Sequence, residues 1–158
     1  MPPKPFVDLR EFDLDHVEFG REEIRQRNPQ RYELELLQAV LTFRPEEGFI
    51  IGEHRPEPDA FWVRGHIPGR PLMPGVLLVE LAAQLCSFYW RVTFPGEPRF
   101  FGFGGIESTR FRGLVVPGNR LIVVGKAVQL KARRAIFDAQ GFVDGAMVYE
   151  TRIIGIPL

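Results

Sequence analysis

The stretch GHIPGRPLMPGVLLVELAAQLCSFYWR, residues 65–91, joins a constrained loop to a long apolar segment. From residue 75 to 91 it is rich in Leu and Ala and apolar on almost every side, which is typical of a buried helix. Pro74 stands where the first turn of a helix tolerates proline, and Arg91 stands where a cation complements the carbonyl end. The pattern predicts a helix over 75–91 that lies inside the protein.

The residues after Pro95 predict a meander of strands. Apolar residues dominate or alternate over 98–111, 119–132, 134–143 and 146–156. Asp144-Gly145 between two such runs is a hairpin signal, because both central residues of that turn need positive φ. One buried helix with long antiparallel strands predicts an α+β fold in which the sheet covers the helix.

The residues before the loop predict an arm, a short helix and a hairpin. Residues 1–20 mix Pro, Asp and Phe without periodicity and predict an irregular arm laid on the single domain formed by 21–158. REEIRQR, 21–27, predicts a short helix closed by Asn28-Pro29. ELELLQAVLTF, 33–43, and GFIIGEH, 48–54, predict two paired strands, the first starting near Leu34.

The composition argues against several classes of function. The 158 residues carry 20 basic and 20 acidic side chains, so no net field favours nucleic acid or an anionic membrane. The start of the chain lacks an apolar signal region, and the longest apolar run contains Glu80 and Gln84, so neither export nor a membrane span is expected. Cys86 is the single cysteine and is expected to be a packing residue. We expect a soluble, cytoplasmic protein.

His66 and Glu80 are the candidate reactive residues. Three prolines and three glycines within 65–80 fix the loop that carries His66, and a carboxylate at Glu80 among apolar residues is costly unless paired or protonated. Taken singly, His66 reads as a hydrogen-bonded loop residue and Glu80 as a buried acid with a backbone donor. His16 and His54 lack such a context and are expected at the surface.

The motif H-x-P-G-x-P-x-M-P-G-V-L-x-x-E resembles the signature of FabZ-type (3R)-hydroxyacyl-(acyl-carrier-protein) dehydratases of the FabA/FabZ family. The His66-to-Glu80 spacing of 14 residues is that of the family, and Gln84, one helical turn further, matches a family glutamine. FGGIESTRFRGLVVPGN, 103–119, is similar to the family's F-x-G-I-D-x-x-R-F-x-x-x-V-V-P-G-D, and the strand order matches from about 21 to 155.

The resemblance implies a hot-dog fold, with a long central helix wrapped by a curved antiparallel sheet, that dimerises as a double hot-dog. It implies dehydration of 3-hydroxyacyl thioesters in fatty acid biosynthesis, with His66 of one protomer and Glu80 of its partner in one site. His66 is expected to be the base and Glu80 the acid or a positioning group; His66 alone can also serve both steps. The free amides of Gly75 and Val76, at the positive end of the helix dipole, are expected to hold the thioester oxygen.

The implied partners are an acyl carrier protein with its acyl-phosphopantetheine and a second copy of the chain. The resemblance implies at least a homodimer, and a trimer of dimers is the larger assembly that it allows. No cofactor is expected, and no CxxC, HExxH or phosphate-binding glycine motif predicts a metal or nucleotide. Candidates for an acyl tunnel are Phe101, Phe103 and Phe111, which otherwise read as core. Arg110 and Arg112 are candidates for carrier docking, and otherwise read as a solvated face.

Departures from the family motif leave the substrate range open. Gln30, Glu33 and Gln38 replace the family's His, Pro and Asp, and Asp59 stands in its Asn position. The related FabA type, which also isomerises the double bond, usually has Asp where this chain has Glu80, which favours dehydration only. Two alternatives stay in view, a non-catalytic acyl-thioester-binding module and a hot-dog thioesterase.

Overall fold

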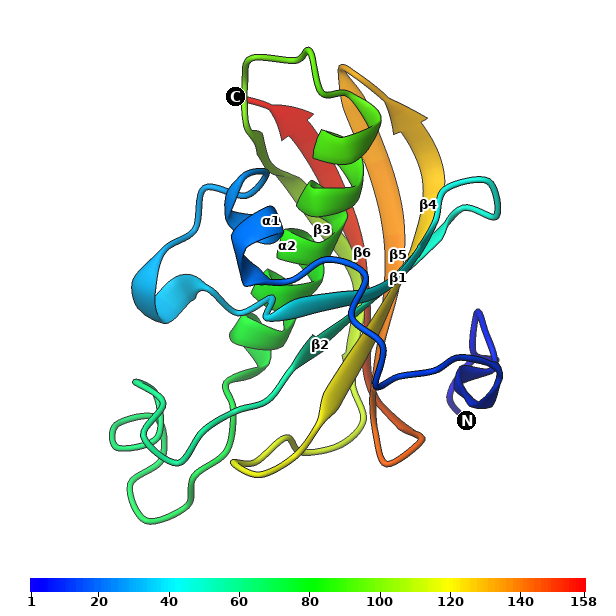
Figure 1. The fold of residues 1–158 in the computed structure, drawn as a ribbon. Helices are drawn as coiled ribbons and strands as arrows, with labels where there is room; N and C mark the ends of the chain where they lie inside the picture. Colours follow the sequence, from blue (N-terminus) through cyan, green and yellow to red (C-terminus); the bar gives the residue numbers. More distant parts are fainter.

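A computed structural model describes residues 1–158, in which a six-stranded antiparallel sheet curves around one central helix (Figure 1). The helix is α2, Gly75–Thr93, and the strand order in the sheet is β1-β2-β4-β5-β6-β3. The strands are β1 Ala39–Arg44, β2 Phe49–His54, β3 Phe101–Phe111, β4 Leu121–Lys131, β5 Arg134–Val143 and β6 Ala146–Pro157. The predicted hot-dog arrangement is confirmed, and β3 lies at one edge of the sheet, paired only with β6.

The inner core forms where α2 packs into the concave face of the sheet. It is a cluster of 26 buried residues, to which α2 contributes Trp90, Tyr89 and Phe88, each at most 1% exposed. The ring of Trp90 stacks on Phe101 of β3 with centroids 5.1 Å apart. α2 is long and apolar enough to cross a membrane, but 61% of its apolar stretch is buried inside the fold, as expected for a core helix.

The convex face of the sheet is apolar too, and the N-terminal arm covers it. A second cluster unites residues of four strands: Ala39, Leu41, Phe49, Ile51, Ile122, Val124 and Phe142. Phe6, Val7, Leu9, Phe12 and Leu14 of the arm pack on this cluster, with a 3-10 turn, η1, at Leu9–Glu11. The arm lies on the opposite side of the sheet from α2 in Figure 1. Burial on both faces explains the unbroken apolar runs of β1, β2 and the first half of β4.

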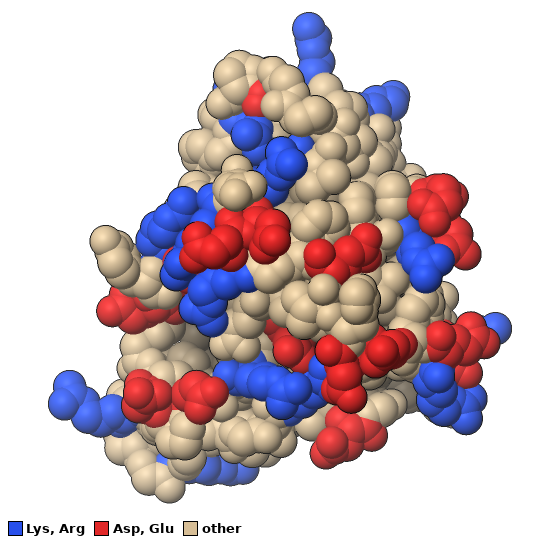
Figure 2. Space-filling model, in the orientation of Figure 1, with Lys and Arg blue, Asp and Glu red and all other residues tan.

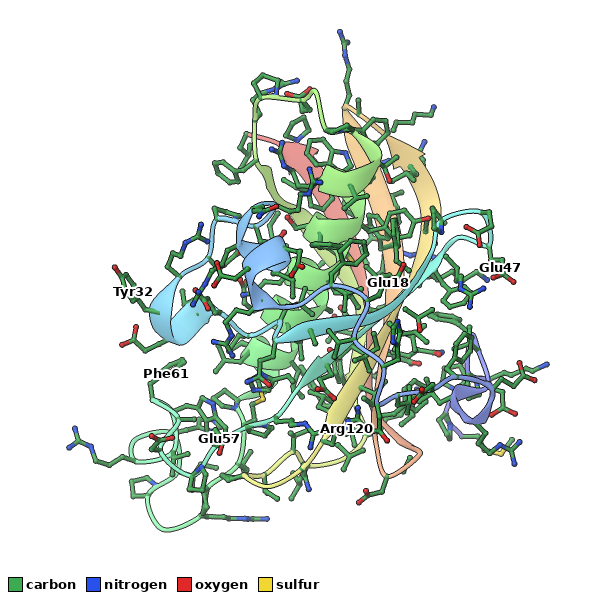
Figure 3. All side chains as sticks on the ribbon, in the orientation of Figure 1. Glu18, Tyr32, Glu47, Glu57, Phe61 and Arg120 are labelled. Carbon is green, nitrogen blue, oxygen red and sulfur yellow. The ribbon has the colours of Figure 1, made fainter.

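Polar contacts fasten the arm. Phe6 N–H donates to the side-chain oxygen of Gln140 at 2.9 Å, and the Gln140 amide donates to Lys4 O at 3.2 Å. Arg120, labelled in Figure 3, bonds Asp15 and Leu14 O of the arm as well as Glu53 of β2. Glu18, in the same view, accepts from Phe43 N–H of β1 at 2.7 Å.

Two expectations were wrong. The first strand starts at Ala39 rather than near Leu34, because a 3-10 turn, η2 at Tyr32–Leu34, turns the chain onto α2. His54 is not at the surface but 6% exposed, and its Nδ1–H donates to Leu36 O at 2.7 Å. The predicted short helix is confirmed as α1, Arg21–Arg25.

Candidate active site

His66 lies on the exposed loop that precedes α2, which Figure 1 shows extending beyond the start of that helix. Its backbone N–H donates to Trp62 O at 3.0 Å, and its Nδ1 lies 3.0 Å from Leu72 O. A carbonyl oxygen only accepts, so the neutral imidazole carries its proton on Nδ1. The lone pair of Nε2 is therefore free, as a general base requires.

Glu80 is half-buried in the second turn of α2, and Gln84 holds it. The Gln84 amide donates from Nε2 to Glu80 Oε1 at 2.9 Å. The same Nε2 donates to Leu34 O at 2.7 Å, and Gln84 Oε1 accepts from Leu36 and Leu37 N–H, both at 3.1 Å. Gln84, 2% exposed, thus fixes the carboxylate of Glu80 and attaches the segment before β1 to the helix.

The start of α2 presents unpaired donors. Pro74 is the N-cap residue and supplies no side-chain hydrogen bond, while Leu77 N–H returns to Pro74 O at 3.0 Å. The amides of Gly75 and Val76 have no partner in the chain, as expected for the first turn of a helix. Phe111 of β3 packs against Gly75, where an added Cβ would lie 2.9 Å from its ring. A larger residue at position 75 would have to displace this ring.

A cavity of about 310 Å³ lies beside Glu80, between α2, the start of β3 and the C-terminus. Its lining comprises Pro29, Gln30, Glu80, Ala83, Ser87, Phe100, Phe101, Gly102, Phe103, Ile153 and Leu158. The volume falls at the lower end of the range of about 300–1,000 Å³ for small-molecule sites. Two of the tunnel candidates, Phe101 and Phe103, are therefore together with Glu80, while Phe111 and His66 are not among the lining residues.

The two arginine candidates differ in their contacts. Arg110 is exposed and donates only to its neighbour's carbonyl, Thr109 O, at 3.0 Å. Arg112 forms an ion pair with Glu150, with Nη2 2.6 Å from Oε1. Figure 2 shows positive and negative side chains interspersed on the visible face, in keeping with the zero net charge.

Three polar residues that the sequence did not assign to the site also lie around it. Asn28, 4% exposed, donates from Nδ2 to Gln84 O at 2.9 Å. Gln30 and Ser87 line the cavity. The signal for Ser87 was present in the sequence, because positions 80 and 87 lie two helical turns apart on one face. Cys86, the neighbouring residue, faces the sheet, and burial raises the pKa of its thiol, as expected for a packing residue.

Comparison with known proteins shows the family of the chain. Residues 28–152 match the model of the FabA-like domain family. The 3-hydroxyacyl-[acyl-carrier-protein] dehydratase FabZ of Fusobacterium nucleatum is 34% identical over 128 residues, which cover 81% of this chain and 89% of that protein. The FabZ of Polynucleobacter necessarius is 33% identical over 125 residues, covering 79% of this chain and 83% of that protein.

Solved structures share the fold at low identity. The dehydratase heterocomplex ApeI:P from Xenorhabdus doucetiae superposes with a TM-score of 0.71 at 14% identity, covering 85% of this chain and 90% of that chain. The PaaI protein of E. coli gives a TM-score of 0.58 at 12% identity, and the match covers 75% of this chain and 78% of that chain. The family match over most of the sequence and the relatives above 30% identity agree: the chain belongs to the FabA-like family and is a FabZ-type dehydratase, a hydro-lyase.

Proposed function

We propose that the protein removes water from (3R)-3-hydroxyacyl chains carried on an acyl carrier protein, giving trans-2-enoyl thioesters for fatty acid biosynthesis in the cytoplasm. The observation that carries the proposal is the carboxylate of Glu80, held by Gln84 at the wall of a cavity that also contains Phe101 and Phe103. An acid beside an apolar cavity suits a substrate whose reacting carbons precede a hydrocarbon tail. The FabZ relatives, named for this reaction, support the assignment.

The elimination divides into three tasks for this chain's residues. His66 Nε2 takes the proton from C2 of the acyl chain, a C2=C3 double bond forms, and the C3–O bond breaks as the hydroxyl leaves with a proton as water. Glu80 supplies that proton, or it positions the hydroxyl while His66 returns the proton it took. The Gly75 and Val76 amides stabilise the negative charge that develops on the thioester oxygen. These are acid–base steps, so the proposal invokes no cofactor.

A dimer would complete the site, with His66 from one protomer and Glu80 from its partner. The edge strand β3 supports this, because an unpaired edge offers free N–H and C=O groups to a second chain. Phe103, Ile106 and Phe111 on this strand are 44%, 49% and 53% exposed, and Val76 at the start of α2 is 75% exposed. Apolar side chains gathered along such an edge fit burial against an identical edge.

The carrier protein would dock near the exposed arginine at the end of β3. Arg110 is free to meet an acidic partner, whereas Arg112 must first be released from Glu150 or act together with it. Local arginines steer an acidic partner even when the net charge is zero.

The test is turnover of a (3R)-3-hydroxyacyl carrier protein, with the 2-enoyl product measured by mass spectrometry. We expect His66→Ala to lower kcat by about 10²- to 10⁴-fold, because the loop keeps its fold while the base is lost. His16→Ala, an exposed histidine of the arm, is the matched control and keeps the wild-type rate. Full turnover by His66→Ala would contradict the proposal. A thiol-trapping dye run in parallel identifies a thioesterase, which releases free thiol.

A further inference from the structure

One face of α2 forms a wall of the cavity beside Glu80. Glu80, Ala83 and Ser87 follow one another at intervals of three and four residues, and all three line the cavity. The strands contribute Phe101 and Phe103 of β3 and Ile153 of β6 to the lining. A chain that enters beside Glu80 and follows the helix therefore reaches Ser87.

Ser87 lies on this wall, and its buried hydroxyl is unpaired. The residue is 3% exposed, and its Oγ has no hydrogen-bond partner. A serine or threonine inside a helix ordinarily donates to the carbonyl four residues earlier. Thr93 of the same helix does so, with Oγ1 2.9 Å from Tyr89 O, whereas Ser87 makes no such bond to Ala83 O. A buried hydroxyl without a partner is destabilising, so its presence needs another explanation.

Gln30 adds a second polar group to the same cavity. Its Oε1 is also buried without a partner, and the residue lines the cavity together with Ser87. Apart from Glu80, these two are the polar members of the lining; the others are Pro29, Ala83, Phe100, Phe101, Gly102, Phe103, Ile153 and Leu158. A cavity built only for a plain hydrocarbon chain has no use for either group, since hydrocarbon satisfies neither.

We propose that the cavity takes acyl chains that carry a second hydroxyl group far from the thioester, and that Ser87 determines this specificity. Ser87 Oγ and Gln30 Oε1 are both covered by neighbouring atoms, so each side chain must rotate for its oxygen to meet the acyl chain. A hydroxyl on the chain both donates and accepts, so it can then pair with the serine hydroxyl and with the acceptor oxygen of Gln30. The inference rests on the proposed function, because Glu80 must meet the 3-hydroxyl for the chain to have this direction.

The helix gives the position of the second hydroxyl. The seven residues from Glu80 to Ser87 span about 10 Å at about 1.5 Å per residue. An extended chain advances roughly 1.2 Å per bond, which corresponds to about eight bonds. With C3 beside Glu80, the second hydroxyl belongs near carbon 11, and the tilt of the side chains widens this to about carbons 9–12.

The experiment is a competition between two substrates in one reaction. Equal amounts of (3R)-3-hydroxydodecanoyl carrier protein and its analogue with a second hydroxyl at carbon 9, 10, 11 or 12 are mixed with wild-type enzyme. The ratio of the two enoyl products, measured by mass spectrometry, gives the ratio of kcat/KM and is independent of the amount of folded enzyme. We expect at least one analogue to be preferred about three- to tenfold, the effect of one neutral hydrogen bond.

Two variants test the residue itself. Ser87→Ala is expected to bring the product ratio to about one. Cys86→Ala shortens the adjacent side chain, which faces Gly125 of β4 rather than the cavity, and is expected to keep the wild-type ratio. Equal consumption of all substrates by the wild type, or an unchanged preference in Ser87→Ala, would overturn the inference.

The proposed function has its own separate readout. The acyl chain of 3-hydroxybutanoyl carrier protein is too short to reach Ser87, so dehydration of this substrate depends on the reacting groups alone. Turnover of this substrate without any preference among the longer ones rejects only the role of Ser87. No enoyl product from any substrate rejects the proposed function and the inference with it.

Discussion

The side chain of Gln84 joins the carboxylate of Glu80 to the segment before β1: its Nε2 lies 2.9 Å from Glu80 Oε1, and its Oε1 accepts two backbone amides. One buried amide therefore serves both the candidate acid and the fold. Loss of Gln84 leaves Leu36 N–H, Leu37 N–H and Leu34 O without this partner.

Gln84→Ala is expected to lower the free energy of unfolding by about 2–4 kcal/mol, because buried groups left without partners cost about 1–3 kcal/mol each. Urea denaturation measures the change. The control is Gln38→Ala, whose side chain forms two hydrogen bonds with Arg55 at the exposed surface, and which is expected to cost under about 1 kcal/mol. Equal effects of the two variants would contradict the role of Gln84.

A composite site predicts recovery of activity in mixed dimers. His66→Ala and Glu80→Gln are each expected to be inactive. After the two are unfolded and refolded together in equal amounts, half of the dimers are mixed, and each mixed dimer has one intact site. The mixture is therefore expected to regain about a quarter of wild-type activity. If the mixture is no more active than the separate variants, both residues act within one protomer.

His54 predicts a loss of stability in mild acid. Burial is the main cause that lowers its pKa below 6.5, and the hydrogen bond to Leu36 O only partly opposes this. Between the folded and unfolded pKa values the unfolded chain binds the proton and the folded protein does not. Stability therefore falls as the pH drops below about 6.5, by up to about 1.4 kcal/mol per pH unit.

The measurement is Tm from pH 8 to pH 5 for wild type and His54→Gln. The variant is expected to show a shallower fall over this range, while His16→Gln in the exposed arm follows the wild type. An identical slope in His54→Gln would show that other groups cause the acid sensitivity.

Gly155 on β6 is predicted to be indispensable for the shape of the cavity. An added Cβ there would lie 1.7 Å from the ring of Phe101, which stacks on Trp90 and lines the cavity. Gly155→Ala must shift that ring, at a cost of about 1–3 kcal/mol. We expect a lower Tm and a lower ratio of dodecanoyl to butanoyl turnover. Gly96→Ala, where a Cβ meets nothing within 4 Å, is the control and should change neither.

The arm is expected to keep the convex face of the sheet from self-associating. Deletion of residues 1–14 would expose the apolar cluster that contains Leu41, Phe49 and Ile51. We expect larger assemblies in light scattering and a lower Tm, because exposed apolar patches of this kind associate. Arg10→Ala breaks only an exposed ion pair with Asp8 and is expected to leave both measurements unchanged. A deletion variant of unchanged size and Tm would contradict the role of the arm.

The sequence by itself determined the helix and five of the six strands, and it predicted the reactive pair. The run from Gly75 onwards is apolar on all sides, which in a soluble domain leaves only a place inside the sheet. The Asp144-Gly145 turn, with both residues at positive φ, fixed the last hairpin locally. The spacing of His66 and Glu80 pointed to the family without any coordinates. His66 precedes the start of the helix and Glu80 follows it, each by a fixed number of residues, so the spacing can be read from the sequence alone.

Only the tertiary structure decided what depends on contacts distant in sequence. The residues before Ala39 alternate like a strand, yet Gln84, 48 residues away from Leu36, takes their amides and turns them onto the helix. His54 lies in a strand with no local signal for burial, and its buried ring bonds Leu36 O, which is distant in sequence. The cavity exists only where α2, β3 and the C-terminus meet. The local sequence pattern therefore could not predict that Phe111 lies outside the cavity or that the hydroxyl of Ser87 is unpaired.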